Sequence, residues 1–211
     1  LTSISGYAEL IETGIAKPED TPDFAHKIHV EASRMIQLVN DILQLSHLDN
    51  VSETGAAPAM ETVDLLDVAR ECVERQKVNA RHSYISLTYL GESAPVTGSR
   101  VLLDELCQNL CDNAIKYNVP DGAVKVQVSS ENGISSVTVS DTGIGIAPEH
   151  QSRVFERFYR VDKSHSKASG GTGLGLSIVK HAVQYHHGDI RLTSKPGEGT
   201  VIRITFPAAA R

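Results

Sequence analysis

Hydrophobic residues in the first part of the chain recur every three or four positions, which is the spacing of one face of a helix. The pattern runs from Leu1 to Ile15 and stops at residues 17–22, a segment of proline and charged residues. It resumes over a longer predicted helix, from about residue 23 to about residue 50, with a stripe formed by Ile28, Ala32, Met35, Val39 and Ile42. Because two helices alone do not bury such a broad apolar face, the pattern predicts a four-helix bundle in a homodimer. Packing of the hairpin against the rest of its own chain is the alternative.

The pattern becomes mixed after the hairpin. Residues 51–60 are rich in small residues and contain a glycine and a proline, so we expect a linker. Helical and strand-like segments alternate over residues 61–211, and Asn132-Gly133 is a strong signal for a hairpin turn. The expected helices are 65–80, 99–117 with Ser99 as N-cap, and one after Gly175 with Gly188 as C-cap; the expected strands are 84–89, 124–128, 136–140, 189–194 and 200–206. Runs of strands with helices to one side predict an α+β protein, in which the helical hairpin is followed by a two-layer α/β sandwich.

The overall composition argues against some functions. The formal net charge of -6 argues against a direct nucleic-acid surface. No apolar run is long enough to span a bilayer, so any link to a membrane is expected to come from upstream segments. Cys72, Cys107 and Cys111 form no metal-ligand pattern and are expected to be buried free thiols in a reducing compartment. The chain begins at Leu1 within a helical pattern, which predicts a fragment of a longer protein.

Two glycine-rich segments indicate a phosphate-binding site. The first is Asp141-Thr142-Gly143-Ile144-Gly145-Ile146, and the second is Gly170-Gly171-Thr172-Gly173-Leu174-Gly175-Leu176. Glycine lets the backbone approach a phosphate closely, and the helical spacing after Gly175 places the second segment at a helix N-terminus, which favours an anion. The charged stretch between them, ending at residues 160–167, is expected to act as a mobile lid. A dinucleotide-binding turn is excluded, because no strand directly precedes the second segment and no βαβ unit follows it.

The predicted helix after Ser99 carries four polar residues on one face: Asn109, Asn113, Lys116 and Tyr117. Amide oxygens can ligate Mg²⁺, an ammonium can neutralise phosphate charge, and a phenol ring can pack on a base or ribose. A solvated polar face is the alternative. Asp141, at the end of a strand, can accept a hydrogen bond from the exocyclic amine of adenine; a simple turn aspartate is the alternative there. Each feature is weak alone, and only the ordered set is specific.

In this order the segments resemble the catalytic and ATP-binding domain of the sensor histidine kinases of two-component systems. Residues 109–117 are similar to the family's N box, 141–146 to its G1 box, 154–160 to its F box, 171–176 to its G2 box and 197–200 to its final glycine turn. Residues 1–50 resemble the family's dimerisation and phosphotransfer hairpin. The resemblance therefore covers essentially the whole chain, as a hairpin (1–50), a linker (51–60) and a catalytic domain (61–211).

The resemblance implies ATP and Mg²⁺ as ligands. Asn113 would hold Mg²⁺, with Asn109 beside it. Asp141 would bind the adenine amine, and Lys116 and Arg160 would contact phosphates.

Aromatic and glycine-rich segments complete the implied site. Tyr117 and Tyr159 would pack near the nucleoside, whereas Phe155 and Phe158 would anchor the lid in a hydrophobic pocket. The glycine boxes supply the remaining expected ATP-binding residues, namely Gly143, Gly145, Ile146, Gly171, Thr172, Gly173, Leu174, Gly175 and Leu176.

One position distinguishes phosphoryl transfer from hydrolysis. In the similar hydrolysing ATPases of the chaperone, gyrase and mismatch-repair branch, a glutamate one turn before the metal asparagine activates water. This chain has Asn109 there. An amide is no general base, so the resemblance implies that the γ-phosphoryl group waits for another acceptor. An ATP hydrolase, the alternative, would turn over without any acceptor protein.

The family's acceptor histidine precedes a stretch ending in Pro-Leu-Thr, with which Leu1-Thr2 aligns. The acceptor is therefore expected upstream of this sequence. His26, His29 and His47 lie on the second helix, where the family places no acceptor, and are expected to be surface or packing histidines. The chain is thus expected to bind Mg-ATP but not to autophosphorylate by itself.

The implied whole protein is a bacterial inner-membrane sensor, and this chain is its cytoplasmic kinase core. It would transfer the γ-phosphoryl group of ATP to its own histidine and then to an aspartate on the receiver domain of a response regulator. A degenerate kinase that only dimerises and binds nucleotide is the alternative, and the intact N, G1, F and G2 boxes argue against it.

Overall fold

The structure is a computed structural model that describes residues 2–54, 59–161 and 171–209, with side chains in the first of these ranges described to residue 43. The chain divides into two compact units. One is Leu1–His47 with Asp162–Thr172, and the other is Leu48–Val161 with Gly173–Arg211. Residues 55–58 of the expected linker and residues 162–170 of the expected lid lie outside the described residues.

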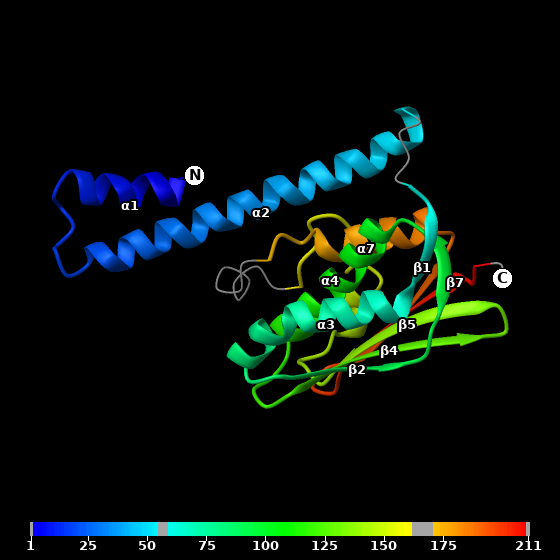
Figure 1. Cartoon of the computed structure of the whole chain (residues 1–211). Helices are drawn as coiled ribbons and strands as arrows, with labels where there is room; N and C mark the ends of the chain where they lie inside the picture. The colour runs from blue at the N-terminus through cyan, green and yellow to red at the C-terminus, as the bar shows by residue number, and fades with distance from the viewer. Residues whose placement is uncertain (1, 55–58, 162–170, 210–211) are drawn as a thin grey trace. The chain divides into compact units, whose positions relative to one another are not determined.

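The expected helical hairpin is formed by α1 (Thr2–Glu12) and α2 (Thr21–Thr54), of which α1 and the part of α2 up to His47 belong to the first unit (Figure 1). The rings of Tyr7 and Phe24 join the two helices with centroids 5.2 Å apart, and the ammonium group of Lys27 lies over both rings. Among the described residues of α1 none is buried. Helix α2 continues through residues 51–54, which were expected to belong to the linker, because Val-Ser-Glu-Thr contains no helix breaker.

The second unit is built on a five-stranded sheet with the order β2-β4-β5-β7-β6. Strand β2 runs parallel to β4, and the other neighbours are antiparallel. The bounds are β2 Ser86–Gly91, β4 Ala123–Glu131, β5 Ile134–Asp141, β6 Asp189–Lys195 and β7 Gly199–Pro207. The β4–β5 hairpin turns at Asn132 and Gly133, both with positive φ, which confirms the predicted turn.

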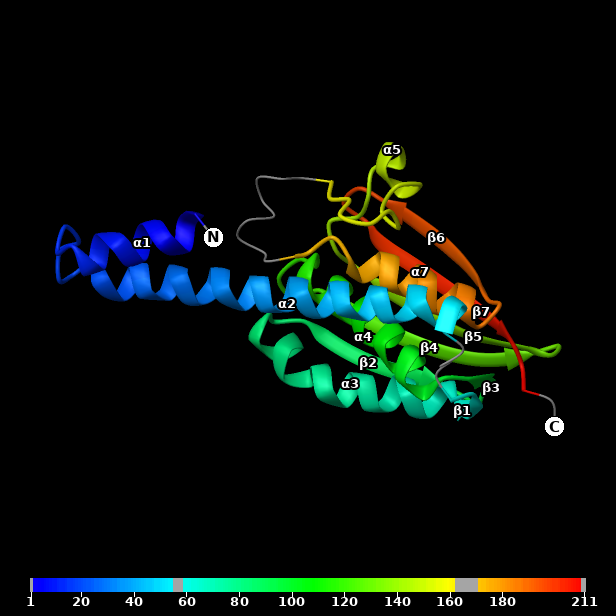
Figure 2. The same ribbon diagram turned by 90° about the horizontal axis from the view of Figure 1, so that it is seen from above.

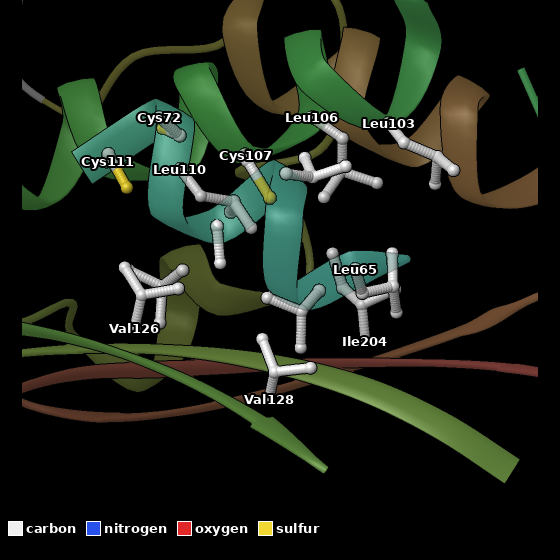
Figure 3. Close-up of a cluster of buried hydrophobic side chains, with 14 of the residues drawn as sticks. Leu65, Cys72, Leu103, Leu106, Cys107, Leu110, Cys111, Val126, Val128 and Ile204 are labelled. Atoms are coloured by element: carbon white, nitrogen blue, oxygen red, sulfur yellow. The ribbon is translucent and has the colours of Figure 1, made fainter. Parts of the chain in front are cut away.

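Three helices cover one face of this sheet: α3 (Leu65–His82), α4 (Arg100–Lys116) and α7 (Gly175–Tyr185) (Figures 1 and 2). Figure 3 shows the core between them, where leucines of α4 point toward valines of β4. Burial along β4 alternates, so every second side chain faces the helices. The three cysteines are free and buried in this core, as predicted. The predicted α+β fold, a helical hairpin followed by an α/β sandwich, is confirmed.

Several elements differ from expectation. Strands β1 (Glu61–Asp64) and β3 (Pro95–Gly98) pair into a small second sheet that the pattern did not predict, because each is only four residues long. A short helix, α5 (Pro148–Gln151), was also missed. Strand β2 begins later than expected, because Tyr84 adopts a φ of 57° directly after the end of α3.

His186, at the C-terminal end of α7, is hydrogen-bonded to the N-terminal end of α4. The prediction of Gly188 as the C-cap of α7 is wrong, because His186 is the C-cap and His187, with a φ of 54°, takes the left-handed conformation after it. Ser99 does occupy the N-cap position of α4, but its side chain makes no capping hydrogen bond. Instead, its buried backbone N–H donates to His186 Nε2 at 2.9 Å, and His186 Nδ1 donates to the Ala182 carbonyl at 2.6 Å. The ring must therefore be neutral, and burial lowers its pKa.

Candidate functional site

The expected metal-binding asparagines lie where two helices of the second unit meet. Asn109 and Asn113 follow one another by one turn of α4, and the first residue of α7, Gly175, packs against them. A Cβ added to Gly175 would lie 2.7 Å from Asn109 Oδ1 and 3.8 Å from Asn113 Nδ2. Asn109 Nδ2 donates to the Glu105 carbonyl at 3.0 Å, which fixes the side-chain amide with its oxygen toward Gly175. Two amides thus face the first turn of a helix, where backbone N–H groups favour an anion.

Asp141 lies at the end of β5 and is held by backbone donors. The N–H groups of Gly143 and Thr200 both donate to its Oδ1, at 2.8 and 3.2 Å. Within the described residues its second oxygen, Oδ2, accepts no hydrogen bond. Burial raises the pKa of the Asp141 carboxyl, and the two N–H donors partly offset that rise. The two bonds fix the carboxylate through Oδ1.

The first glycine box forms a tight loop beside the end of α4. The Ile144 N–H donates to the Tyr117 carbonyl at 3.0 Å, and a Cβ on Gly143 would lie 2.3 Å from that same carbonyl oxygen. Gly145 has a φ of 69°, and its Cβ would lie 2.0 Å from the Lys195 carbonyl oxygen. Only glycine fits at these two positions, so the box is built for close backbone approach.

The same loop is tied to β6. The Ile146 N–H donates to Ser194 Oγ at 2.8 Å. Gln151 Nε2 donates to the carbonyls of Ile146 and Ser194, each at 2.8 Å. The position of the box is therefore fixed from both sides.

The F-box residues are only partly as expected. The Phe158 N–H donates to the Gly173 carbonyl at 2.9 Å, which joins the F box to the second glycine box. Phe158 was expected to sit in a hydrophobic pocket, and this is wrong: its side chain is 59% exposed, because a φ of 62° turns it outward. Phe155 is half-buried. Tyr159 hydrogen-bonds His150 Nδ1 through its hydroxyl group at 2.7 Å.

The remaining expected binding residues differ in their position and burial in the structure. Lys116 has its ammonium group 5.4 Å from the ring centroid of Tyr117. Leu174 is buried, and Leu176 packs on the core. Arg160 lies half-buried after the F box. Gly171 and Thr172 belong to the helical unit and are not part of the geometry of this site, and Gly170 lies outside the described residues.

Polar links between α3 and α4 brace the asparagine-bearing helix from behind. Arg75 pairs with Asp104 at 2.6 Å, and the buried Gln76 donates to Asp112. Gln76 in turn accepts from Asn79 at 2.9 Å. Helical periodicity does not predict these links, because they join two helices that are separated in the chain by β2 and β3.

Mg²⁺ fits this donor set. Within the described residues no cluster of three or more His, Cys, Asp or Glu side chains is suited to hold a metal. Mg²⁺ bound with a nucleotide usually needs few protein ligands, because phosphates and water supply the others. The two amides at the start of α7 therefore suit a metal that arrives with a triphosphate.

This geometry agrees with what the chain resembles among known proteins. Residues 98–210 match the family described as "Histidine kinase-, DNA gyrase B-, and HSP90-like ATPase", so the second unit is an ATP-binding domain of that class. Residues 1–51 match the His Kinase A (phospho-acceptor) domain. The combination shows that the chain belongs to the sensor histidine kinases.

Individual relatives support this assignment. The sensor-like histidine kinase SenX3 of Mycolicibacterium smegmatis is 40% identical over 210 residues, covering 97% of this chain and 53% of the relative. The mycobacterial sensor histidine kinase MprB has a solved structure with a TM-score of 0.62 and 33% identity, covering 72% of this chain and 100% of that one. The histidine kinase ThkA, solved in complex with the response regulator TrrA, has a TM-score of 0.76 and covers 99% of this chain and 57% of that one. At 22% identity, this match shows a similar fold. The chain spans about half the length of the SenX3 relatives it matches. No helix of the described residues is long and apolar enough to cross a membrane.

Proposed function

We propose that the second unit binds ATP with Mg²⁺ and acts as a phosphoryl donor. The observation that carries this proposal is the packing of Asn109 and Asn113 against Gly175 at the start of α7, beside the loop that fixes Asp141. Asn113 and Asn109 would hold Mg²⁺, which neutralises charge on the phosphates when bound. Asp141 Oδ2 would accept a hydrogen bond from the adenine amine, and the first turn of α7 would donate N–H groups to the phosphates.

Lys116 and Arg160 would contact the phosphates, and Tyr117 and Tyr159 would lie near the nucleoside. Tyr117 is 41% exposed, so its ring is accessible to a base. The glycine-box residues of the second unit would form the backbone cradle, namely Gly143, Gly145, Ile146, Gly173, Leu174, Gly175 and Leu176. This part of the proposal rests on the family resemblance together with the close contacts at Gly143, Gly145 and Gly175.

Transfer is favoured over hydrolysis by the chemistry of Asn109. Its amide donates to the Glu105 carbonyl and cannot take a proton from water. In a full-length kinase of this family the γ-phosphoryl group would go to a histidine and then to an aspartate of a response-regulator receiver domain. None of the nine histidines of this sequence is proposed as the acceptor. The hairpin would form the dimer, since Ile36 and Val39 of α2 are 63% and 54% exposed on its apolar face.

Nucleotide binding tests the site directly. Asn113→Ala and Asp141→Ala should each weaken binding of a non-hydrolysable ATP analogue with Mg²⁺, about tenfold or more, as measured by calorimetry. The matched control is Asn79→Ala on α3, which removes an amide whose hydrogen bond within the described residues goes to Gln76 of the same helix. Unchanged affinity in both site variants would refute the assignment.

Labelling tests the role as donor. Residues 1–211 incubated with ATP labelled in the γ-phosphoryl group should take up no acid-labile, base-stable label, and should release little phosphate. Rapid phosphate release without an acceptor protein would instead support a hydrolase.

A further inference from the structure

Asn118, directly after α4, uses its whole side-chain amide in hydrogen bonds. Its Nδ2 donates to the carbonyls of Ala114 and Ala123, at 3.0 and 3.1 Å. Its Oδ1 accepts from the Val119 N–H at 2.9 Å and from the Thr142 hydroxyl at 3.2 Å. A side-chain amide offers two donors and two acceptor positions, so the capacity of Asn118 is filled.

Two of these bonds lie within the helix end, and two reach other segments. The bonds to Ala114 and Val119 are local and suit a helix end. The bonds to Ala123 and Thr142 join α4 to the first residue of β4 and to the first glycine box. A residue that only ended the helix would need none of these longer contacts.

The partners of Asn118 are themselves bonded together. The Thr142 N–H donates to the Ala123 carbonyl at 3.1 Å, and the Ala123 N–H donates to Thr142 Oγ1 at 2.9 Å. Thr142 follows Asp141, whose side chain is fixed by the next N–H along, that of Gly143. The network therefore links the end of α4 to the strand end that presents Asp141.

Asn118 also lies close to the backbone of the first glycine box. A Cβ on Gly143 would lie 3.0 Å from Asn118 Cα as well as 2.3 Å from the Tyr117 carbonyl oxygen. Because the Asn118 amide holds the glycine-box loop against the helix end, loss of the amide would let the two segments separate. That change would move Asp141 relative to Tyr117, while the contacts of Asn109 and Asn113 with Gly175, more than one turn away along α4, would stay.

We propose that Asn118 is a positioning residue for adenine recognition, which sets the distance between the base-reading carboxylate of Asp141 and the end of α4. The inference rests on the proposed function, because it assumes that Asp141 reads the adenine amine. It predicts that Asn118 acts on the base and not on the triphosphate.

The test compares three ligands with Mg²⁺ on the chain of residues 1–211 by calorimetry: a non-hydrolysable ATP analogue, its inosine counterpart, which lacks the exocyclic amine, and inorganic triphosphate. Asn118→Ala should weaken the ATP analogue about five- to twentyfold, as expected for loss of one or two hydrogen bonds. It should change the affinity for inosine analogue and triphosphate by less than about twofold. Asn79→Ala again serves as the control for the loss of a helix-surface amide.

A second pair of variants keeps the inference testable if Asn118→Ala does not fold. Thr142→Val removes the hydroxyl group at nearly constant shape, and Thr142→Ser keeps it. The valine variant should lose preference for the adenine analogue over the inosine analogue, and the serine variant should retain it. Equal preference in the two variants overturns the inference.

The outcomes separate this inference from the function on which it rests. If the unaltered chain prefers adenine and Asp141→Ala removes that preference, but Asn118→Ala weakens all three ligands equally or none, Asn118 has only a structural role. If the unaltered chain binds both nucleotides equally, base reading by Asp141 is itself refuted. In a double-mutant cycle, Asn118→Ala should add nothing to Asp141→Ala for the ATP analogue.

Discussion

Replacing Gly175 by alanine should separate folding from nucleotide binding. Gly175 begins α7 and does not adopt a positive φ, so alanine suits its backbone. The atom nearest to the added Cβ would be the terminal oxygen of the Asn109 side chain, at 2.7 Å, and Asn113 Nδ2, at 3.8 Å, would be in ordinary contact. A flexible side-chain end can yield, whereas a backbone atom cannot.

The magnitudes follow from this contact. Asn109 Oδ1 must move from 2.7 Å to the 3.4 Å of ordinary contact, a shift of about 0.7 Å. Alanine is favoured over glycine in helices by up to about 1 kcal/mol, which offsets the local repacking. The free energy of unfolding should therefore change by less than about 1 kcal/mol. Mg²⁺ tolerates little distortion of its ligands, so Mg²⁺-dependent affinity should fall about 10- to 100-fold.

The assay pairs urea denaturation with calorimetry. Affinity for the ATP analogue is measured with Mg²⁺ and again with a chelator, and the loss should be larger with Mg²⁺. Gly6→Ala is the matched control, because Gly6 also lies in a helix, and a Cβ there would meet nothing within 4 Å. It should leave binding unchanged.

A folded Gly175→Ala chain that binds the Mg²⁺ complex as tightly as the unaltered chain would refute the reasoning. Asn109 would then not take part in binding, or its contact with Gly175 would not matter. A variant that unfolds would equally contradict the claim that a flexible side chain absorbs the added methyl group.

Three further predictions concern stability. His186→Gln should lower the free energy of unfolding at pH 7.5 by about 1–3 kcal/mol, because the buried Ser99 N–H loses its acceptor. In urea titrations, the difference in this free energy from the unaltered chain should shrink on going to pH 5.5. The reason is that burial lowers the pKa of His186, so the unfolded chain takes up the proton first. Asp64 caps α3, and although burial opposes its charge, hydrogen bonds hold the pKa of its carboxyl below the usual value. Asp64→Ala should therefore lower the free energy of unfolding by about 0.5–2 kcal/mol at pH 7, and by progressively less as the pH falls through the usual carboxyl range toward 3. Gly145→Ala should lower the melting temperature sharply, unlike Gly175→Ala, since its Cβ would lie 2.0 Å from the backbone carbonyl of Lys195. An equal effect of the two alanine substitutions on melting temperature would contradict that distinction.

Local periodicity predicted the parts of the fold that it encodes. The spacing of three and four residues gave both helices of the hairpin, and Asn132-Gly133 gave the turn between β4 and β5. The spacing of Asn109 and Asn113 was enough to place both amides on one side of α4. These features depend on neighbours in sequence, so the sequence shows them directly.

Contacts between distant segments were not predictable in the same way. Nothing local indicates that Ser99 donates to His186, or that Asn118 bonds to Thr142. The exposure of Phe158, whose backbone has a φ of 62°, runs against the apolar character of its side chain. Such positions are set by tertiary packing, which overrides the preference of the residue.

Asp141 and Thr200 are directly paired in the sheet, on neighbouring strands β5 and β7. The chain between them leaves β5 after Asp141, forms α5, α7 and β6, and returns to this pair through Gly199, which has a φ of 97°. The free-energy cost of closing a flexible loop grows only logarithmically with the length of the loop, so doubling that length costs about 0.6 kcal/mol. Residues added to a flexible loop between the two glycine boxes would therefore change the stability of the sheet very little. Such a loop can therefore change in length in evolution while the strand ends at Asp141 and Thr200 keep their places.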